Sequence, residues 1–273
     1  MNQRADDEVV DESTRESVRE HDELLTVIVP CLNEVGNVRG TAESIFETAP
    51  ELDVDVEILF IDDGSTDGTL EVMEEICAEH PECRIMVNSE NMGLGSSVLK
   101  AYERIDEDSW ATVIPGDNEF VFGSIKNFLE IRHDYDVILG YLKNPVIRTF
   151  LRRMASDAFT EIANVLYGFD FRYFNGLKMY RVKCFKGIET VSEGHAFNPE
   201  LLAKAMLRNP DLRIGEAPFV IKGRDEGESK AFTPEAVAQA IRDLYVGYHA
   251  VVEYREKMIK RSDDSAVYEE MFD

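Results

Sequence analysis

Near-continuous apolar runs of strand length alternate with helix-like segments, and this alternation limits the fold more than any other feature of the chain. The apolar runs cover residues 24–30, 56–62, 83–88, 110–116 and 135–140. The helix-like segments between them cover residues 35–49, 67–80, 93–105 and 123–133. Runs without polar alternation are typical of strands buried on both faces. The pattern therefore predicts an α/β fold with a mostly parallel, doubly wound sheet, whose ligand site lies at the carboxyl ends of the strands.

The alternation lapses from about residue 144. Helices are expected over residues 146–168, 199–207 and 234–260, and a further strand over 217–223. We expect a disordered acidic tail at 1–23, one domain at 24–232, and a helical extension with a tail at 233–273. The last helix is interpreted as a core-packing or dimer-forming helix, with contact to a membrane interface as the alternative.

Charge and cysteine content exclude several classes of protein. The chain carries 29 basic and 54 acidic residues, a net charge of −25, which repels nucleic acid phosphates. This charge fits either a high-salt proteome or an ordinary acidic protein. The four cysteines fall at no metal-ligand spacing, and neither a signal peptide nor a membrane span is recognisable. We therefore expect a cytoplasmic protein with reduced thiols and no nucleic acid partner.

Polar residues follow the first two predicted strands directly. In "TVIVPCLNE", Pro30 marks the point where the first strand leaves the sheet, because proline cannot donate a hydrogen bond to a neighbouring strand. In "EILFIDDGSTDGT", Asp62 and Asp63 end the second strand and Gly64 permits a tight turn. A capped turn into the next helix explains the glycine, but it does not explain two adjacent carboxylates.

The segment "VIPGDNEF" places two more carboxylates, Asp117 and Glu119, after the fourth predicted strand. Oxygen ligands two residues apart suit a hard divalent ion such as Mg²⁺ or Mn²⁺, which completes its shell with phosphates and water. The alternative is a solvated turn, since the chain is rich in acids. The segment is predicted to lie at the same sheet edge as Asp62 and Asp63, and this position favours the interpretation as a metal site.

Taken in order, "TVIVPCLNE", "ILFIDDGSTDGT", "NMGLGSSVLKAY" and "GDNEF" resemble the family 2 glycosyltransferases with the GT-A fold. The likeness covers about residues 24–232 and is nearest to the dolichol-phosphate mannosyltransferase and polyprenyl-phosphate glycosyltransferase branch. The resemblance implies a nucleotide-sugar donor whose base and ribose contact Pro30, Leu32, Glu34, Asp62 and Asp63. It also implies that Asp117 and Glu119 replace the Asp-x-Asp motif of the family, with glutamate as a departure from the commonest pattern.

Cations are scarce in this chain, so their clusters are informative. One cluster holds Arg148, Arg152 and Arg153, and the other holds Lys222, Arg224 and Lys230. The resemblance implies that phosphates of the donor and acceptor contact Arg152, Arg153, Ser156, Arg224, Ser229 and Lys230. A solvated helix face is the alternative for the first cluster.

Several further residues are candidates for the acceptor pocket. The resemblance places the turn at Asn175 and Gly176 beneath this pocket, with Arg181 facing phosphate or pairing with a surface acid. His195 and Glu200 are weaker candidates beside it. A phosphate acceptor is already ionised and needs no general base, whereas a hydroxyl acceptor would require one such as His195.

These observations combine into one functional hypothesis, the metal-dependent, inverting transfer of one sugar from a UDP- or GDP-sugar to a polyprenyl phosphate. A soluble or glycan hydroxyl acceptor and a non-catalytic nucleotide-sugar-binding module are the alternatives. A nucleotidyltransferase is disfavoured because "PCLNEVGN" has no Lys or Arg, and the Gln-x-x-Arg-Trp motif of polymerising relatives is absent. Further expectations are peripheral contact with the cytoplasmic face of a membrane and a homodimer.

Overall fold

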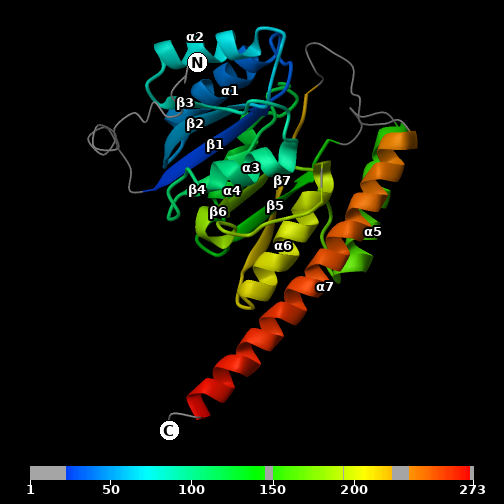
Figure 1. The fold of residues 1–273 in the computed structure, drawn as a ribbon. Coiled ribbons are helices and arrows are strands. Elements are labelled where there is room, and N and C mark those ends of the chain that lie inside the picture. The colour runs from blue at the N-terminus through cyan, green and yellow to red at the C-terminus, as the bar shows by residue number, and fades with distance from the viewer. Residues whose placement is uncertain (1–22, 145–149, 193, 223–233, 271–273) are drawn as a thin grey trace, which may run out of the picture.

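A seven-stranded sheet forms the centre of the computed structural model, which describes residues 23–144, 150–192, 194–222 and 234–270. The strand order is β3-β2-β1-β4-β6-β5-β7 (Figure 1). The strands are β1 (Leu24–Cys31), β2 (Asp55–Asp62), β3 (Cys83–Val87), β4 (Trp110–Val113), β5 (Val137–Leu142), β6 (Lys178–Arg181) and β7 (Ile214–Phe219). Of these seven, β6 alone runs antiparallel to its neighbours. The predicted mostly parallel sheet is confirmed.

Helices follow the strands and cover both faces of the sheet. The α-helices are α1 (Val38–Thr48), α2 (Thr69–Glu79), α3 (Leu94–Tyr102), α4 (Lys126–Leu129), α5 (Phe150–Tyr167), α6 (Phe197–Arg208) and α7 (Pro234–Glu270). The described residues also form four short 3₁₀ helices, η2 (Ala49–Glu51), η3 (Phe122–Ile125), η5 (Val182–Cys184) and η6 (Gly194–Ala196). The predicted helix at 123–133 is therefore η3 followed by the short α4.

Successive residues of the central strands point to opposite faces, so the sheet has two hydrophobic cores. Val27 and Val29 of β1 belong to the core that includes Val38 of α1 and Met73 of α2. Ile28 belongs to the core that includes residues of α3, α5, α6 and α7. Both faces of β1 are thus covered, which explains why its sequence is apolar without alternation.

Strand β7 differs from its predicted position at 217–223, because it covers Ile214–Phe219. It lies at the edge of the sheet beside β5, where Pro218 is tolerated and where exposure alternates along the strand. The first half of β7 therefore lacks the contiguous apolar run by which the inner strands were recognised, and the predicted strand begins too late in the sequence.

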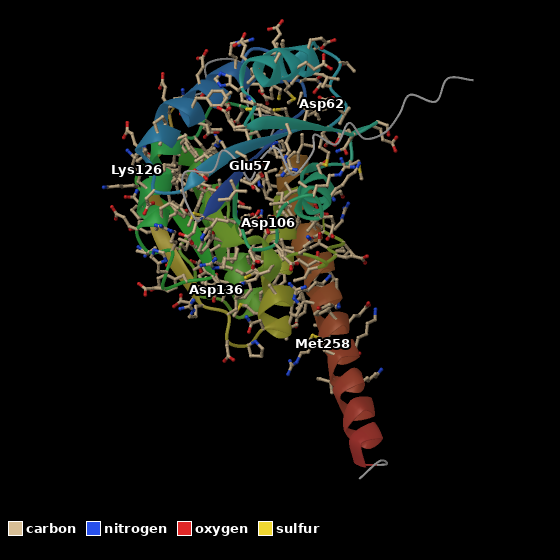
Figure 2. The ribbon with its side chains drawn as sticks, turned by 90° about the vertical axis from the view of Figure 1, so that its left-hand side faces the viewer. Glu57, Asp62, Asp106, Lys126, Asp136 and Met258 are labelled. Atoms are coloured by element: carbon tan, nitrogen blue, oxygen red, sulfur yellow. The ribbon has the colours of Figure 1, made fainter. Side chains whose placement is uncertain are left out.

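The long helix α7 has a packed part and a projecting part. It contacts α5 and α6, and Leu244 is fully buried there, which agrees with the predicted core-packing role. The remainder extends beyond the body of the domain (Figure 1), and Met258 lies on this projecting part, at the opposite end of the molecule from Asp62 (Figure 2). Among the helices described, none is long and apolar enough to cross a membrane.

Candidate active site

The carboxyl ends of β1, β2 and β4 meet at one edge of the sheet. Cys31 at the end of β1 is paired in register with Asp62 at the end of β2. The amide of Asp63 donates to the carbonyl of Cys31 at 2.9 Å, and the amide of Gly116 donates to the carbonyl of Pro30 at 3.1 Å. The three predicted motifs are therefore neighbours, as the parallel topology requires.

The loop after β1 is fastened to the loop after β2 by hydrogen bonds from both sides. Asn33, in the left-handed region at φ 58°, accepts from the amide of Thr66 at 2.9 Å and donates its own amide to Ser65 Oγ at 3.0 Å. The amide of Glu34 donates to Thr69 Oγ1 at 2.8 Å. The sequence analysis missed Asn33, although asparagine is among the few residues that adopt this conformation readily.

The two adjacent aspartates differ in their surroundings. The Asp62 carboxylate is buried and accepts from the amide of Ser65 at 3.2 Å. The Asp63 carboxylate accepts four hydrogen bonds with lengths between 2.8 and 3.0 Å. The donors are the side chains of Asn88 and Ser97 and the backbone amides of Met92 and Gly93. Asp63 therefore holds the loop between β3 and α3 in place, a role that the sequence analysis did not predict.

The turn after β4 buries both predicted metal ligands. Asp117 is 6% exposed and Glu119 is 4% exposed. Between them, Asn118 has φ 54° and its amide donates to Thr41 Oγ1 of α1 at 3.1 Å. A Cβ atom on Gly40 would lie 2.4 Å from Asn118 Nδ2, so glycine at this position of α1 allows the turn to pack closely. A solvated turn, the alternative interpretation, does not describe these residues.

Negative charge accumulates where the three motifs meet. Burial raises the pKa of the Cys31 thiol, and the carboxylates of Glu34, Asp62 and Asp117 raise it further. A hard divalent cation would fit Asp117 and Glu119, because carboxylate oxygens are its preferred ligands. No cluster of three or more acidic, His or Cys side chains suited to a metal occurs in the part of the chain described, so phosphate and water would complete the shell.

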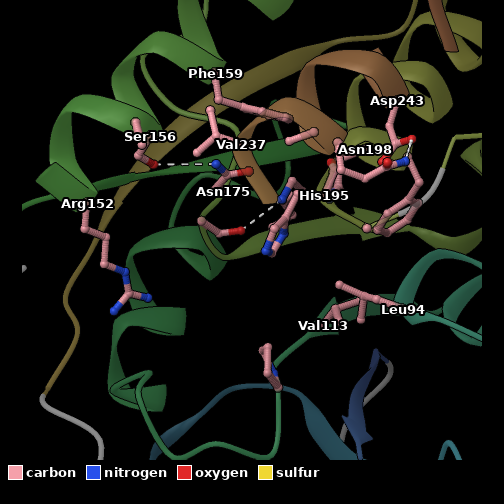
Figure 3. A pocket seen from close by; sticks show the side chains of 18 of the residues that line it. Leu94, Val113, Arg152, Ser156, Phe159, Asn175, His195, Asn198, Val237 and Asp243 are labelled. Carbon is pink, nitrogen blue, oxygen red and sulfur yellow. Dashed lines mark hydrogen bonds between the residues drawn. The ribbon is translucent and has the colours of Figure 1, made fainter. Parts of the chain in front are cut away.

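Helix α5 brings a cation to this edge. Arg152 donates to Glu119 Oε2 at 3.0 Å, and Ser156 one turn further along donates to the hydroxyl of Tyr173 at 3.0 Å. Asn175 approaches Ser156 Oγ at 3.5 Å (Figure 3). Arg152 thus lies beside Glu119, and the contact of Arg152 and Ser156 with phosphate stays a prediction.

A pocket of about 440 Å³ begins at these polar groups and continues between α5, α7 and η6. Its polar residues include Asp117, Glu119, Arg152, Ser156, Asn175 and Lys178. Its apolar walls include Leu94, Val113, Phe159, Ile162, Phe197, Val237, Ala240 and Ile241. Figure 3 shows Arg152 and Ser156 on the α5 side of the pocket, with Leu94 and Val113 on the sheet side. His195 also lines this pocket, and its place beside the acceptor stays a prediction.

Three residues that were considered for phosphate or acceptor contact lie elsewhere. Arg153 lines a separate hollow on the other side of α5, with its guanidinium 5.8 Å from the Phe150 ring centroid. Arg181 stacks on Trp110 at 4.4 Å and pairs with Glu23 at 3.8 Å, so the alternative of pairing with an acid holds. Glu200 is fully buried and does not line the pocket.

Glu200 fixes the segment that precedes η6. Its carboxylate accepts from the amides of Val191 and Ser192 and from the Ser192 hydroxyl, and it pairs with Lys204 at 2.6 Å. The prediction that Glu200 lies beside the acceptor is therefore wrong. A carboxylate that must neutralise a buried lysine and close a turn is directed into the core instead.

Three predicted phosphate contacts, Arg224, Ser229 and Lys230, lie outside the described residues, as does Arg148 of the first cation cluster. Lys222, the last residue before residues 223–233, donates its amide to the carbonyl of Glu119 at 2.8 Å. Lys178 of β6 also lines the pocket, although the sequence did not indicate it as a site residue. The antiparallel placement of β6 beside β4 brings it there.

The fold and the arrangement of the three strand-end motifs define a GT-A glycosyltransferase. The sequence model of the family "Glycosyl transferase family 2" matches residues 26–190, more than half of the chain. The chain belongs to this family, and it is a glycosyltransferase of the branch that contains the polyprenyl-phosphate enzymes.

Two relatives illustrate this branch. The dolichol-phosphate mannosyltransferase of Saccharomyces cerevisiae is 29% identical over 238 residues, which cover 81% of this chain and 86% of the relative. The undecaprenyl-phosphate mannosyltransferase of Micrococcus luteus is 24% identical over 228 residues, 79% of this chain and 91% of the relative.

Among solved structures, glucosyl-3-phosphoglycerate synthase from Mycobacterium tuberculosis has the same fold. Its complex with Mn²⁺, uridine diphosphate and glucosyl-3-phosphoglycerate aligns with a TM-score of 0.57 and 16% identity, covering 84% of this chain and 80% of the other. Sequence identity at this level supports the shared fold and no more.

Proposed function

We propose that this enzyme transfers one sugar, with inversion, from a UDP- or GDP-sugar to a polyprenyl phosphate. One observation carries the proposal, namely that a single pocket joins a charged end at Asp117, Glu119 and Arg152 to long apolar walls. A sugar diphosphate matches the charged end, and an isoprenoid chain matches the walls. The two mannosyltransferase relatives, whose names specify dolichol phosphate and undecaprenyl phosphate, support this acceptor class.

The donor end of the site is assigned to the strand-end loops. Pro30, Leu32 and Glu34 would contact the base and ribose together with Asp62, whose carboxylate accepts a single hydrogen bond from within its own turn. Asp63 would support this site indirectly, since its carboxylate is engaged by the loop before α3. The fastened β1 and β2 loops would hold the donor in a fixed orientation.

Asp117 and Glu119 are assigned to Mg²⁺ or Mn²⁺. The structural neighbour from M. tuberculosis has been crystallised with either ion and uridine diphosphate, which supports divalent metal use in this fold. The ion would act as a Lewis acid on the leaving diphosphate. Arg152, paired with Glu119, is positioned to share the negative charge that develops there.

In the proposed step, an oxygen of the acceptor phosphate attacks the anomeric carbon as the bond from that carbon to the donor diphosphate breaks. The nucleoside diphosphate leaves with the bonding electron pair, and the configuration inverts because a single displacement occurs. The attacking oxygen is already ionised, so no side chain has to remove a proton. Arg152 and Ser156, one turn apart on α5, would orient the two phosphates.

A hydroxyl acceptor is the second candidate, and the presence of His195 in the pocket favours it. Its imidazole could accept the hydroxyl proton. The apolar walls disfavour a hydrophilic acceptor, because its polar groups would lie against side chains that offer them no hydrogen bonds. The contact of phosphates with Arg224, Ser229 and Lys230 stays a prediction. The formation of a homodimer also stays a prediction.

Contact with the cytoplasmic face of a membrane would follow from a lipid acceptor. Phe150, Leu151 and Met154, at the beginning of α5, are 65%, 75% and 53% exposed. They flank Arg152 in sequence, and Phe150 and Met154 line the neighbouring hollow that also includes Arg153. Ile241 of α7, which is 46% exposed, lines the pocket itself. Exposed apolar groups near a binding pocket are typical of membrane-interacting surfaces.

The test is transfer by the full-length protein from a panel of UDP- and GDP-sugars with Mn²⁺, to either farnesyl phosphate or free sugars. Extraction of a glycosylated lipid phosphate would confirm the lipid acceptor, whereas transfer to a free sugar hydroxyl would establish the second candidate. Asp117→Asn should lower the rate at least about hundredfold and remove Mn²⁺-dependent donor binding. Asp134→Asn, an exposed carboxylate away from the pocket, is the control.

A further inference from the structure

Lys178 is a lysine in the wall of the pocket, and it has no acidic partner among the described residues. Its Nζ donates to the carbonyl of Gly176 at 3.0 Å, and no carboxylate of the described residues pairs with it. Its side chain is half-buried, and desolvation lowers the pKa of the amine to about 7. An ammonium group in such surroundings is costly unless a counter-charge arrives.

Lys204 provides the contrast within the same protein. It is more deeply buried, but Glu200 lies 2.6 Å from its Nζ and the carbonyl of Glu189 accepts from it at 2.8 Å. With 54 acids against 29 basic residues, a carboxylate for a buried lysine is readily available to this chain. Lys178 therefore stands out as a cation for which the described residues provide no counter-charge.

The neighbours of Lys178 form a continuous series of hydrogen-bonding groups along one wall. Gly176, which accepts from Lys178, follows Asn175, and Asn175 approaches Ser156 at 3.5 Å. Ser156 lies one turn from Arg152 on α5. All five residues line the same pocket, and Figure 3 shows the link between Ser156 and Asn175. Donors thus extend from the charged end of the pocket to Lys178.

We propose that Lys178 Nζ binds the phosphate of the acceptor and supplies the positive charge that holds this anion beside the apolar walls. The inference rests on the proposed function and assigns its acceptor subsite to a residue of β6. An ammonium group has three donors, and the carbonyl of Gly176 occupies one. Two donors remain for phosphate oxygens, and the phosphate in turn provides the missing counter-charge.

Acceptor affinity should then depend on pH. Because the free amine titrates near pH 7 and a phosphate binds its ammonium form, affinity for a phosphate falls as the pH rises above 7. The other charged or titratable groups of the pocket are Asp117 and Glu119 after β4, Arg152 of α5, His195 of η6, Asp243 of α7, Tyr102 of α3 and Tyr180 of β6. Lys178→Arg separates these contributions, because arginine stays charged throughout this range.

The experiment measures binding of farnesyl phosphate and of farnesol to the full-length protein, and the KM and kcat for farnesyl phosphate. Lys178→Met should weaken farnesyl phosphate binding about tenfold to a hundredfold and leave farnesol binding unchanged. Lys178→Arg should retain most of the affinity with less dependence on pH. Lys183→Met, an exposed lysine paired with Asp108 at 3.6 Å, is the matched control.

The outcomes separate this inference from the proposed function. Equal affinity of Lys178→Met and the unchanged protein for farnesyl phosphate would overturn the role of Lys178, while transfer by both would leave the proposed function intact. No transfer to farnesyl phosphate by the unchanged protein would instead refute the proposed function. The pH dependence of farnesyl phosphate binding by the unchanged protein, compared with farnesol, tests the same role without any substitution, and the absence of a difference would count against it.

Discussion

Asp62 and Asp63 are neighbours in sequence, yet their side chains serve different parts of the molecule. Successive side chains at a strand end point in different directions, so Asp62 stays at its own turn while Asp63 reaches the loop before α3. Asn88 and Ser97, which both donate to Asp63, are buried. A sequence motif of two carboxylates therefore contains one candidate ligand contact and one structural anchor.

Asp63→Ala should lower the free energy of unfolding by roughly 2–4 kcal/mol, because it leaves buried donors without an acceptor. Urea denaturation measures the change, with Glu90→Ala, an exposed carboxylate of the same loop region, as the control. A loss confined to donor affinity, with unchanged stability, would show that Asp63 acts as a ligand contact instead.

Lys178 predicts a stability effect with a definite sign. The pKa of its amine falls from 10.5 to about 7 on folding, so the unfolded chain binds more protons between these values. Stability therefore rises with pH across this window, and the cost of the buried ammonium is fully present below pH 7. Lys178→Met should raise Tm most at or below pH 7, by roughly 2–4 °C for each kcal/mol recovered.

Calorimetry of Lys178→Met and the unchanged protein at pH 6.5 and at a pH near 10 checks this effect, with Lys183→Met as the control. The difference in Tm should shrink toward the higher pH. A difference independent of pH would mean that packing, and not the charge, determines the effect.

At the scale of elements, α7 depends on one glycine to reach α5 and α6. A Cβ atom at Gly247 would lie 2.7 Å from Tyr167 Oη, 3.1 Å from Ser192 Oγ and 3.2 Å from Glu200 Oε2. Tyr167 cannot move away freely, since its hydroxyl donates to the carbonyl of Leu244 at 3.1 Å. The glycine therefore couples α7 to the buried network around Glu200.

Gly247→Ala should lower the free energy of unfolding by about 1–3 kcal/mol, because the overlap outweighs the better helix propensity of alanine. Gly123→Ala is the matched control, since a Cβ atom there meets nothing within 4 Å. Thermal unfolding measures the Tm of both variants. A higher Tm for Gly247→Ala than for the unchanged protein would refute the close packing of α7 at this residue.

The elements also show which parts of the fold the sequence could predict. The inner strands were recognisable because β1 and β2 are buried on both faces and therefore lack polar alternation. The placement of β6 could not be recognised from the sequence, because Ala111 of β4 pairs with Tyr180 of β6, and no local pattern reveals a pairing between residues so far apart in the chain. The strand-end residues of the site were accordingly predicted from local motifs, whereas Lys178 and the anchoring role of Glu200 depend on long-range packing.

At the scale of the whole molecule, net charge and exposed apolar residues act in opposite directions on membrane contact. A net charge of −25 repels anionic lipid, while Phe150, Leu151 and Met154 offer apolar area near the pocket. Salt screens the repulsion and leaves the apolar contribution in place. Binding to phosphatidylcholine vesicles should therefore exceed binding to phosphatidylglycerol vesicles at low salt, and the difference should narrow as salt is added.

Replacement of Phe150, Leu151 and Met154 by serine should reduce the vesicle-bound fraction more than tenfold, since each large apolar side chain contributes on the order of 1.5–3 kcal/mol when buried. Val165→Ser is the control, because Val165 is 81% exposed near the other end of the same helix, where it lines a different hollow. Cosedimentation with vesicles provides the measurement. If Val165→Ser reduced binding as much as the triple variant, the contact would be spread along α5 and would not bring the pocket entrance to the lipid.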